Sequence, residues 1–315
     1  MKALPIKKDS NTIVSFDQYD DAGIYKINNS LIVQTIDVIT PVVDDPYIFG
    51  RIVAVNAMSD IFAMGGIPKT ALSFLSYNLN IESAIIKTIL EGAINELNKE
   101  NCILLGGHTV EDQELKCGFA ITGIIEDNRI YRNNTLKVDD EIILTKKIGT
   151  GIISTAIKAD MASNDAIGDA VDSMVTSNNV ASKIMKNYNI TACTDVTGFS
   201  LIGHLYEMVQ TKDLSVCLNF QGIPILNKAL EYISMGLIPG GAYRNKNFLK
   251  PVIDFKNIND DYAMLLFDPQ TSGGLIIGVN KNESKQLLKH LKSAGYPANI
   301  IGKVTEKKDK PIYVI

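Results

Sequence analysis

The chain has 315 residues, of which 46% are hydrophobic and 21% are charged, and its formal net charge is −4. Its length allows two domains with ordinary cores, and an acidic balance without a long basic cluster argues against nucleic acid as a partner. No segment is long and apolar enough to span a bilayer, and the opening residues lack the apolar core of a signal peptide. The four cysteines have no CxxC spacing, which favours buried thiols over a disulfide framework or a zinc site. We therefore expect a cytoplasmic protein that contacts no membrane.

The first half of the chain predicts alternating strands and helices. Two β-rich runs within 22–39 flank the turn-like sequence NNS and predict a hairpin. Residues 55–66, VNAMSDIFAMGG, predict a helix that ends at two glycines. A strand is expected over 69–79. The run 82–100 predicts an amphipathic helix with an apolar stripe formed by Ile85, Ile89, Ala93 and Leu97.

Two further strands, 102–107 and 117–125, are expected around a loop that carries glycines. Polar residues without a pattern near 134–140 predict a domain boundary, with one domain over 1–137 and a second over 138–315. The second half opens with a strand, a loop and a helix over 141–159. It then mixes expected helices (175–188, 199–210, 225–236 and 283–295) with expected strands (215–220, 274–280, 299–304 and 312–315). This order favours an α/β or α+β fold with helices on one face of a sheet.

Single aspartates in apolar surroundings are the strongest candidates for chemistry. Asp37 lies inside an apolar strand, and Asp60 lies inside an apolar helix, one turn after Asn56 and on the same helix face. Asp195 follows a short apolar run before a helix, and Asp21 precedes the first strand of the hairpin. A charge in apolar surroundings is costly unless it is paired, and Mg²⁺ is bound by carboxylate oxygens that it shares with substrate phosphates.

A second interpretation of these acids is that each caps a helix or a turn. Taken one at a time, Asp20, Asp44 and Asp45 fit that interpretation better than they fit a metal site. It is weak for Asp37 and Asp60, because both lie inside predicted elements.

Glycine pairs are the second feature that could bind phosphate. The sequence LLGGHTVED runs from a strand into Gly106–Gly107 and then His108 and Thr109, and DPQTSGGL and IPGGAYRN contain further pairs. Backbone N–H groups freed by such turns can bind phosphate, although most glycine pairs are only tight turns. Neither a P-loop nor a GxGxxG fingerprint is present. Of the histidines, only His108 is a functional candidate, whereas His204 and His290 are expected to be packed or at the surface.

Several stretches together resemble the selenophosphate synthetase (selenide, water dikinase) family. They are DDAGIYKI, TIDVITPVVDDPYIFGRIVAVNAMSDIFAMGGIPKTAL, LLGGHTVED, TDVTGFSLIGHLYEM, GLIPGGAYRN and DPQTSGGL, in order along the chain. The resemblance implies that ATP, selenide and water are converted to selenophosphate, AMP and phosphate. It also implies the two-domain α/β fold of aminoimidazole ribonucleotide synthetase. In that fold the N-terminal domains of a homodimer form a shared β-barrel, and ATP binds in a cleft without a P-loop.

The resemblance also implies roles for individual residues. Asp21, Asp60 and Asp195 match the family's magnesium ligands, and Asp37 matches an acid that contacts nucleotide and metal. Gly107, His108 and Thr109 match a nucleotide-contacting loop, Asp20 belongs to the segment before the first metal ligand, and Asn56 matches an asparagine that orients a metal ligand or a phosphate.

The family's glycine-rich N-terminal segment with a reactive Cys and a Lys is not found in this chain, so no catalytic residue is assigned. Two alternatives therefore stay open. One is an ATP-binding paralogue that regulates rather than catalyses, and the other is a different ATP-using enzyme of the same structural group.

Overall fold

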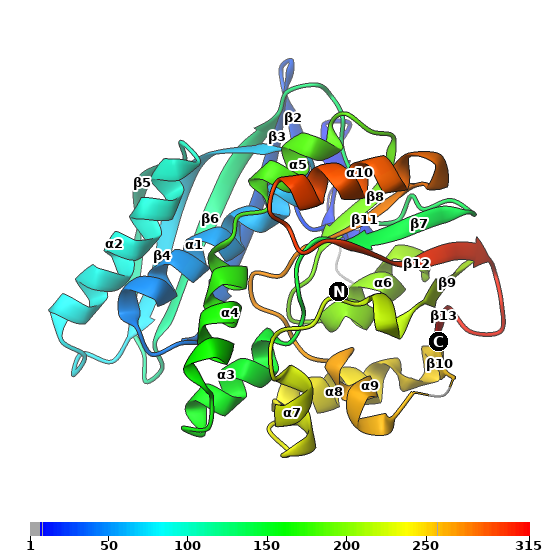
Figure 1. Ribbon diagram of the computed structural model, residues 1–315. Coiled ribbons are helices and arrows are strands. Elements are labelled where there is room, and N and C mark those ends of the chain that lie inside the picture. The colour runs from blue at the N-terminus through cyan, green and yellow to red at the C-terminus, as the bar shows by residue number, and fades with distance from the viewer. Residues whose placement is uncertain (1–6, 8, 257) are drawn as a thin grey trace. The chain divides into compact units, whose positions relative to one another are not determined.

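A computed structural model describes residues 7, 9–256 and 258–315 and divides the chain into two compact units, Met1–Tyr131 and Arg132–Ile315 (Figure 1). Residues 1–6 and 8, at the start of the chain, lie outside the described residues. Among the described residues, no helix combines the length and the apolar character needed to cross a membrane.

The first unit is built on a six-stranded sheet with the strand order β1-β2-β3-β6-β4-β5. The strands are β1 (Thr12–Val14), β2 (Gly23–Ile27), β3 (Ser30–Ile39), β4 (Ile67–Tyr77), β5 (Ile103–Glu111) and β6 (Lys116–Ile125), with a short 3-10 helix at Phe16–Gln18. The predicted hairpin is confirmed as β2 and β3, and Asn28 in the turn between them takes the left-handed conformation that asparagine tolerates. Among the described strands of this sheet, only β4 and β5 pair in parallel.

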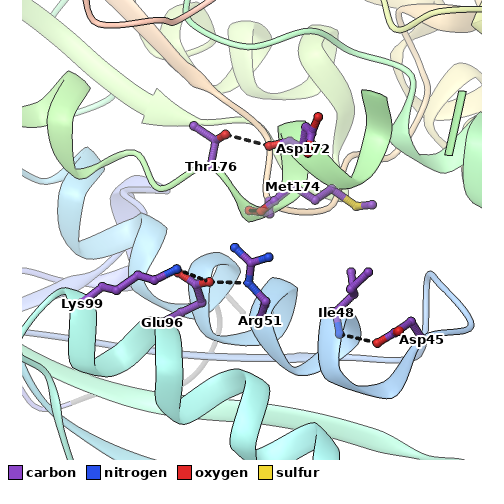
Figure 2. Close-up of polar contacts among 9 residues, drawn as sticks. Asp45, Ile48, Arg51, Glu96, Lys99, Asp172, Met174 and Thr176 are labelled. Atoms are coloured by element: carbon purple, nitrogen blue, oxygen red, sulfur yellow. Dashed lines mark hydrogen bonds and ion pairs between the residues drawn. The ribbon is translucent and has the colours of Figure 1, made fainter. Parts of the chain in front are cut away.

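Two helices, α1 (Pro46–Ala63) and α2 (Ser83–Lys99), complete this unit. The helix predicted over 55–66 begins earlier, because the Asp45 side chain accepts a hydrogen bond of 2.8 Å from Ile48 N and Pro46 occupies the first turn (Figure 2). The capping interpretation of Asp45 is thus confirmed. In α2 the predicted apolar stripe is wrong at one position, because Ile85 is exposed and Ile86 is buried in its place.

The glycine-bearing loop predicted after 102–107 is instead part of a strand. Gly106, Gly107, His108 and Thr109 lie within β5, which continues to Glu111 beside β4. The physical reason is close contact between the strands: a Cβ at Gly107 would lie 1.9 Å from Ser73 Oγ, so only glycine fits there. Because β5 is the edge of the sheet, most of its residues are exposed.

The second unit contains a seven-stranded sheet with the order β10-β13-β9-β12-β7-β11-β8. Its strands are β7 (Asp140–Leu144), β8 (Ile190–Asp195), β9 (Leu214–Leu218), β10 (Ile253–Phe255), β11 (Leu275–Asn280), β12 (Asn299–Glu306) and β13 (Ile312–Val314). The α-helices are α3 (Thr150–Lys158), α4 (Asn164–Val175), α5 (Asn179–Met185), α6 (Ser200–Val209), α7 (Ala229–Ser234), α8 (Gly240–Leu249), α9 (Asp260–Leu265) and α10 (Lys281–Ser293), with 3-10 turns at Phe220–Gly222 and Lys250–Val252.

Most predicted elements of the second half are present, with three corrections. The helix expected over 175–188 is shorter, because α4 ends at Val175 and the extended Thr176 separates it from α5. The glycine pair of IPGGAYRN does not form a loop but the first turn of α8. Leu275, Ile276 and Ile277 are all buried in succession on β11, so this strand is covered on both faces and not on one face as expected.

Candidate metal and nucleotide site

Two pairs of polar side chains interlock between β3 and α1. Thr35 and Asp37 are two residues apart on β3, so their side chains share one face of the strand. Asn56 and Asp60 lie one turn apart on α1. Asn56 Nδ2 donates to Asp37 Oδ2 at 2.8 Å, and the Thr35 hydroxyl donates to Asp60 Oδ2. The spacing makes both contacts possible, because two strand residues span about 6.6 Å and four helix residues about 6 Å. We call these four residues the carboxylate ladder.

The carboxylate ladder contains ionisable side chains that are largely buried. Asp60 is 8% exposed and Asn56 is 4% exposed. Asp21, which precedes β2, has a carboxylate oxygen within 4.8 Å of one from Asp60. Two carboxylates so close repel each other unless a cation or a proton lies between them. The neighbouring carboxylates of Asp21 and Asp60 offer the hard oxygen donors that Mg²⁺ prefers, so these two residues fit the predicted metal.

The predicted nucleotide-contacting residues do not all lie beside the ladder. Asp20 is adjacent to Asp21 in the chain, and its side chain is partly exposed. Gly107, His108 and Thr109 lie on β5, which is separated from β3 by two intervening strands, a distance of about 14 Å. The structure therefore brings Asp21, Asp37, Asn56 and Asp60 together and places the β5 residues at the far edge of the same sheet.

Thr35 is the ladder residue that the sequence analysis missed. A threonine in a β-rich strand is ordinary, and its hydroxyl carries no charge that would single it out. The signal that could have found it is its position two residues before Asp37, because residues i and i+2 of a strand share one face.

Asp195, the remaining predicted metal ligand, belongs to the second unit. It ends β8, pairs with Leu275 across the sheet and is 1% exposed. Lys146 is buried near it, and its Nζ donates to Ser272 O at 2.9 Å. Burial lowers the pKa of Lys146 to about 7, although the charge of Asp195 partly opposes that shift. The sequence did not indicate Lys146, because the pair Lys146–Lys147 looks like an exposed basic turn.

The other histidines lie as expected. His204 is buried in α6, and its Nε2 accepts a hydrogen bond of 3.1 Å from Thr197 N. Its Nδ1 lies 3.3 Å from a Glu207 carboxylate oxygen. His290 is exposed on α10 and contacts the Tyr188 hydroxyl through Nδ1 at 2.6 Å.

Comparison with known proteins identifies the family. Residues 19–125 match the N-terminal domain, and residues 137–315 the C-terminal domain, of AIR synthase related proteins. The selenide, water dikinase of Pelobacter propionicus is 44% identical over 315 residues, covering 99% of this chain and 90% of the relative. That of Caldanaerobacter subterraneus is 42% identical, covering 99% and 91%. This chain belongs to the selenide, water dikinase family.

Solved structures support the fold of this dikinase family member. Thiamine monophosphate kinase of Aquifex aeolicus has a TM-score of 0.67 at 15% identity, covering 93% of this chain and 90% of the kinase. The hydrogenase maturation protein HypE in complex with ATP also has a TM-score of 0.67, at 14% identity, covering 90% and 81%. The predicted two-domain α/β fold is confirmed. The six-stranded sheet of a single chain is open over the described residues, so the shared barrel stays a prediction.

Proposed function

We propose that this protein catalyses the ATP-dependent synthesis of selenophosphate from selenide and water, with release of AMP and phosphate. The observation that carries the proposal is the carboxylate ladder, built into a chain that is 44% identical to a selenide, water dikinase over nearly its full length. The ladder supplies what transfer from a polyphosphate needs, which is precise positioning and stabilisation of negative charge.

Asp21, Asp37 and Asp60 would hold Mg²⁺, and the resemblance assigns Asp195 to the same role. When bound, Mg²⁺ neutralises phosphate charge and polarises the phosphoryl oxygens. The Thr35 hydroxyl fixes the orientation of the Asp60 carboxylate, and the Asn56 amide does the same for Asp37. A carboxylate accepts at both of its oxygens, so one such hydrogen bond orients it without exhausting its capacity to bind a cation.

ATP is the second partner, and the nucleotide contacts stay proposals. Asp20 lies next to Asp21, where a metal-bound triphosphate would be near. Gly107, His108 and Thr109 are exposed on the edge strand β5, where backbone and side-chain donors are accessible to a ligand. Extended backbone at a sheet edge would replace the P-loop that the sequence lacks.

A homodimer and a cytoplasmic location complete the proposal. The dimer is supported by apolar side chains that the first unit leaves exposed on its sheet, on β3 (Ile36 and Val38), on β4 (Leu72) and on β5 (Ile103 and Leu105). A second copy that covers this surface would continue the open sheet into the predicted barrel. The location is supported by the four cysteines, none of which forms a disulfide.

The test is turnover by the full chain under anaerobic conditions with ATP, Mg²⁺ and selenide, followed by ³¹P NMR. We expect signals of selenophosphate, AMP and phosphate in equal amounts. The substitution Asp60→Asn removes a proposed metal ligand, and Asn56→Ala removes the amide that orients Asp37. We expect Asn56→Ala to lower Mg²⁺-dependent ATP affinity or turnover by about 10- to 100-fold, and Asp60→Asn by more.

Glu91→Gln is the matched control, because it removes one exposed carboxylate from α2 in the same unit and should leave both measurements unchanged. Circular dichroism shows whether each variant is folded. ATP binding without any turnover would favour the regulatory paralogue, and turnover without selenium incorporation would favour another ATP-using enzyme of the group. Normal Mg²⁺-dependent ATP binding by Asp60→Asn would refute the metal assignment.

A further inference from the structure

A pocket of about 800 Å³ lies in the second unit, along the strands β10, β13, β9 and β12 at one end of its sheet. None of its lining residues belongs to the carboxylate ladder. Lys256 follows β10, Lys303 lies on β12, Lys308 and Lys310 lie between β12 and β13, and all four line the pocket with Tyr313 and Cys217. Figure 1 shows β9, β10, β12 and β13 side by side near the C-terminus. A volume of this size accommodates a small metabolite.

The pocket carries a local charge opposite in sign to that of the whole chain. The side chains of four lysines and two aspartates, Asp254 and Asp309, line it, and their formal charges sum to 4 − 2 = +2, whereas the side chains of the whole chain sum to −4. Over the part of the chain that the structure describes, Lys256, Lys303 and Lys308 form no ion pair with a carboxylate. Neighbouring ammonium groups repel one another, and a bound anion would reduce this electrostatic repulsion.

Two of these ammonium groups are held over one aromatic ring. Lys308 Nζ lies 5.0 Å and Lys256 Nζ 5.7 Å from the centroid of the Tyr313 ring. The ring is fixed in turn, because its hydroxyl accepts a hydrogen bond of 3.0 Å from Lys310 N. Cation–π contacts of this kind hold flexible lysine side chains in place without neutralising them. The two charges are therefore positioned before any ligand arrives.

We propose that this pocket binds a phosphorylated small molecule, whose phosphate group is held by Lys256, Lys303 and Lys308 over Tyr313. Lysine binds phosphate as a point charge, so several convergent ammonium groups suit a phosphate better than a planar carboxylate. The site uses no residue of the carboxylate ladder, so this proposal does not depend on the proposed reaction. Free phosphates and nucleotides share this chemistry, and the experiment below distinguishes them.

Cys217 offers a direct readout of the pocket. Its Sγ lies 3.2 Å from Lys308 Nζ, and it is partly exposed, whereas Cys102, Cys117 and Cys193 are buried. Burial also raises the pKa of Cys102 to about 11 and that of Cys117 to about 12, which suppresses their thiolate forms. Alkylation of the folded protein by iodoacetamide should therefore report on Cys217.

The experiment measures alkylation of Cys217 in the full chain, without Mg²⁺, at increasing pyrophosphate or AMP, with NaCl at matched ionic strength as the salt control. Calorimetry on the same samples gives the affinity. We expect saturable protection of Cys217 by pyrophosphate, by AMP or by both. Tighter binding of pyrophosphate would identify a free phosphate as the ligand, and tighter binding of AMP would identify a nucleotide.

The double variant Lys256→Gln/Lys303→Gln keeps Lys308 beside the thiol and should weaken binding on the order of tenfold. Lys289→Gln/Lys292→Gln on α10 is the matched control, because it removes two exposed lysines that do not line this pocket, and it should bind as the wild type does. Equal protection by NaCl, or unchanged affinity in the pocket double variant, would overturn the proposal. Because Mg²⁺ and selenide are absent, failure here says nothing about the proposed reaction.

Discussion

At the scale of single residues, the carboxylate ladder explains why an acid lies in the apolar sequence VNAMSDIFAMGG. Asp60 receives a hydrogen bond from Thr35, and Asn56 donates one to Asp37, so each helix residue is matched to a residue on the strand. Asp37, Asn56 and Asp60 could be predicted because polar residues in apolar elements are costly and therefore informative. The position of Thr35 on the same strand face as Asp37 could be predicted, but its contact with Asp60 could not, because that contact depends on which helix packs against the strand.

Asp268 is another buried acid, and it lies outside the ladder in the loop DPQTSGG of the second unit. Its Oδ2 accepts hydrogen bonds from Gln270 Nε2 at 2.8 Å and from Gly151 N at 3.1 Å. Complete burial raises the pKa of Asp268 to about 7, and hydrogen bonds from Gln270, Ile152 and Gly151 oppose that shift only in part. The carboxyl group thus joins this loop to the start of α3.

This raised pKa predicts a pH dependence of stability. Between about pH 4 and pH 7 the native state keeps the Asp268 proton that the unfolded chain has lost, so stability falls as pH rises through this window. Asp268→Asn removes the titration, and its stability relative to wild type should increase with pH by up to about 1.4 kcal/mol per pH unit. Urea denaturation at pH 4.5, 6 and 7.5, followed by circular dichroism, measures this difference. A difference that is constant with pH would show that Asp268 titrates at its ordinary pKa.

At the scale of elements, the position of α1 depends on two glycines at its contact with α2. A Cβ at Gly50 would lie 1.8 Å from Ile89 O, and a Cβ at Gly92 would lie 2.0 Å from Tyr47 O. The helices also share a polar contact, in which Glu96 accepts from Arg51 Nε at 2.5 Å and from Lys99 Nζ at 2.9 Å (Figure 2). This close packing presses α1, with Asn56 and Asp60, between α2 and the sheet.

Gly92→Ala should therefore destabilise the first unit, although alanine favours helices more than glycine does. The added methyl group meets backbone atoms of α1, and overpacking of this kind costs about 1–3 kcal/mol, which exceeds the propensity gain of about 1 kcal/mol. Thermal denaturation by circular dichroism is the measurement. Gly168→Ala on α4 is the control, because nothing lies within 4 Å of its added Cβ, and it should be neutral or stabilising. Equal stability of the two variants would contradict close packing of α1 on α2.

At the scale of the whole molecule, the open sheet of the first unit presents apolar side chains to solvent. Ile36 of β3 and Leu72 of β4 both lie opposite Ala120 of β6, so they share one face of the sheet. Ile36 is 62% exposed and Leu72 is 50% exposed. A contiguous apolar surface of this kind is unusual on a monomer and is typical of an interface.

Charged substitutions on that face should disrupt the proposed homodimer. We expect wild-type protein to sediment as a dimer and Ile36→Lys/Leu72→Lys to sediment as a monomer, because dimerisation would bury the two ammonium groups without partners. Analytical ultracentrifugation across a concentration series is the measurement. Leu79→Lys, an equally apolar and exposed position beyond β4, should leave the dimer intact. A wild-type monomer at all concentrations would refute the proposal.

The sequence by itself determined the order of most elements, the hairpin of β2 and β3, the helix that carries Asn56 and Asp60, and the family, because hydrophobic periodicity and motifs are local properties of the chain. Only the tertiary structure decided that GGHT is strand rather than loop, that Thr35 orients Asp60, and that Lys256 joins Lys303 and Lys308 around Tyr313. Those features depend on which segments, distant in sequence, come into contact. These contacts are determined by side-chain packing and by strand pairing across the sheet, which no local sequence pattern predicts.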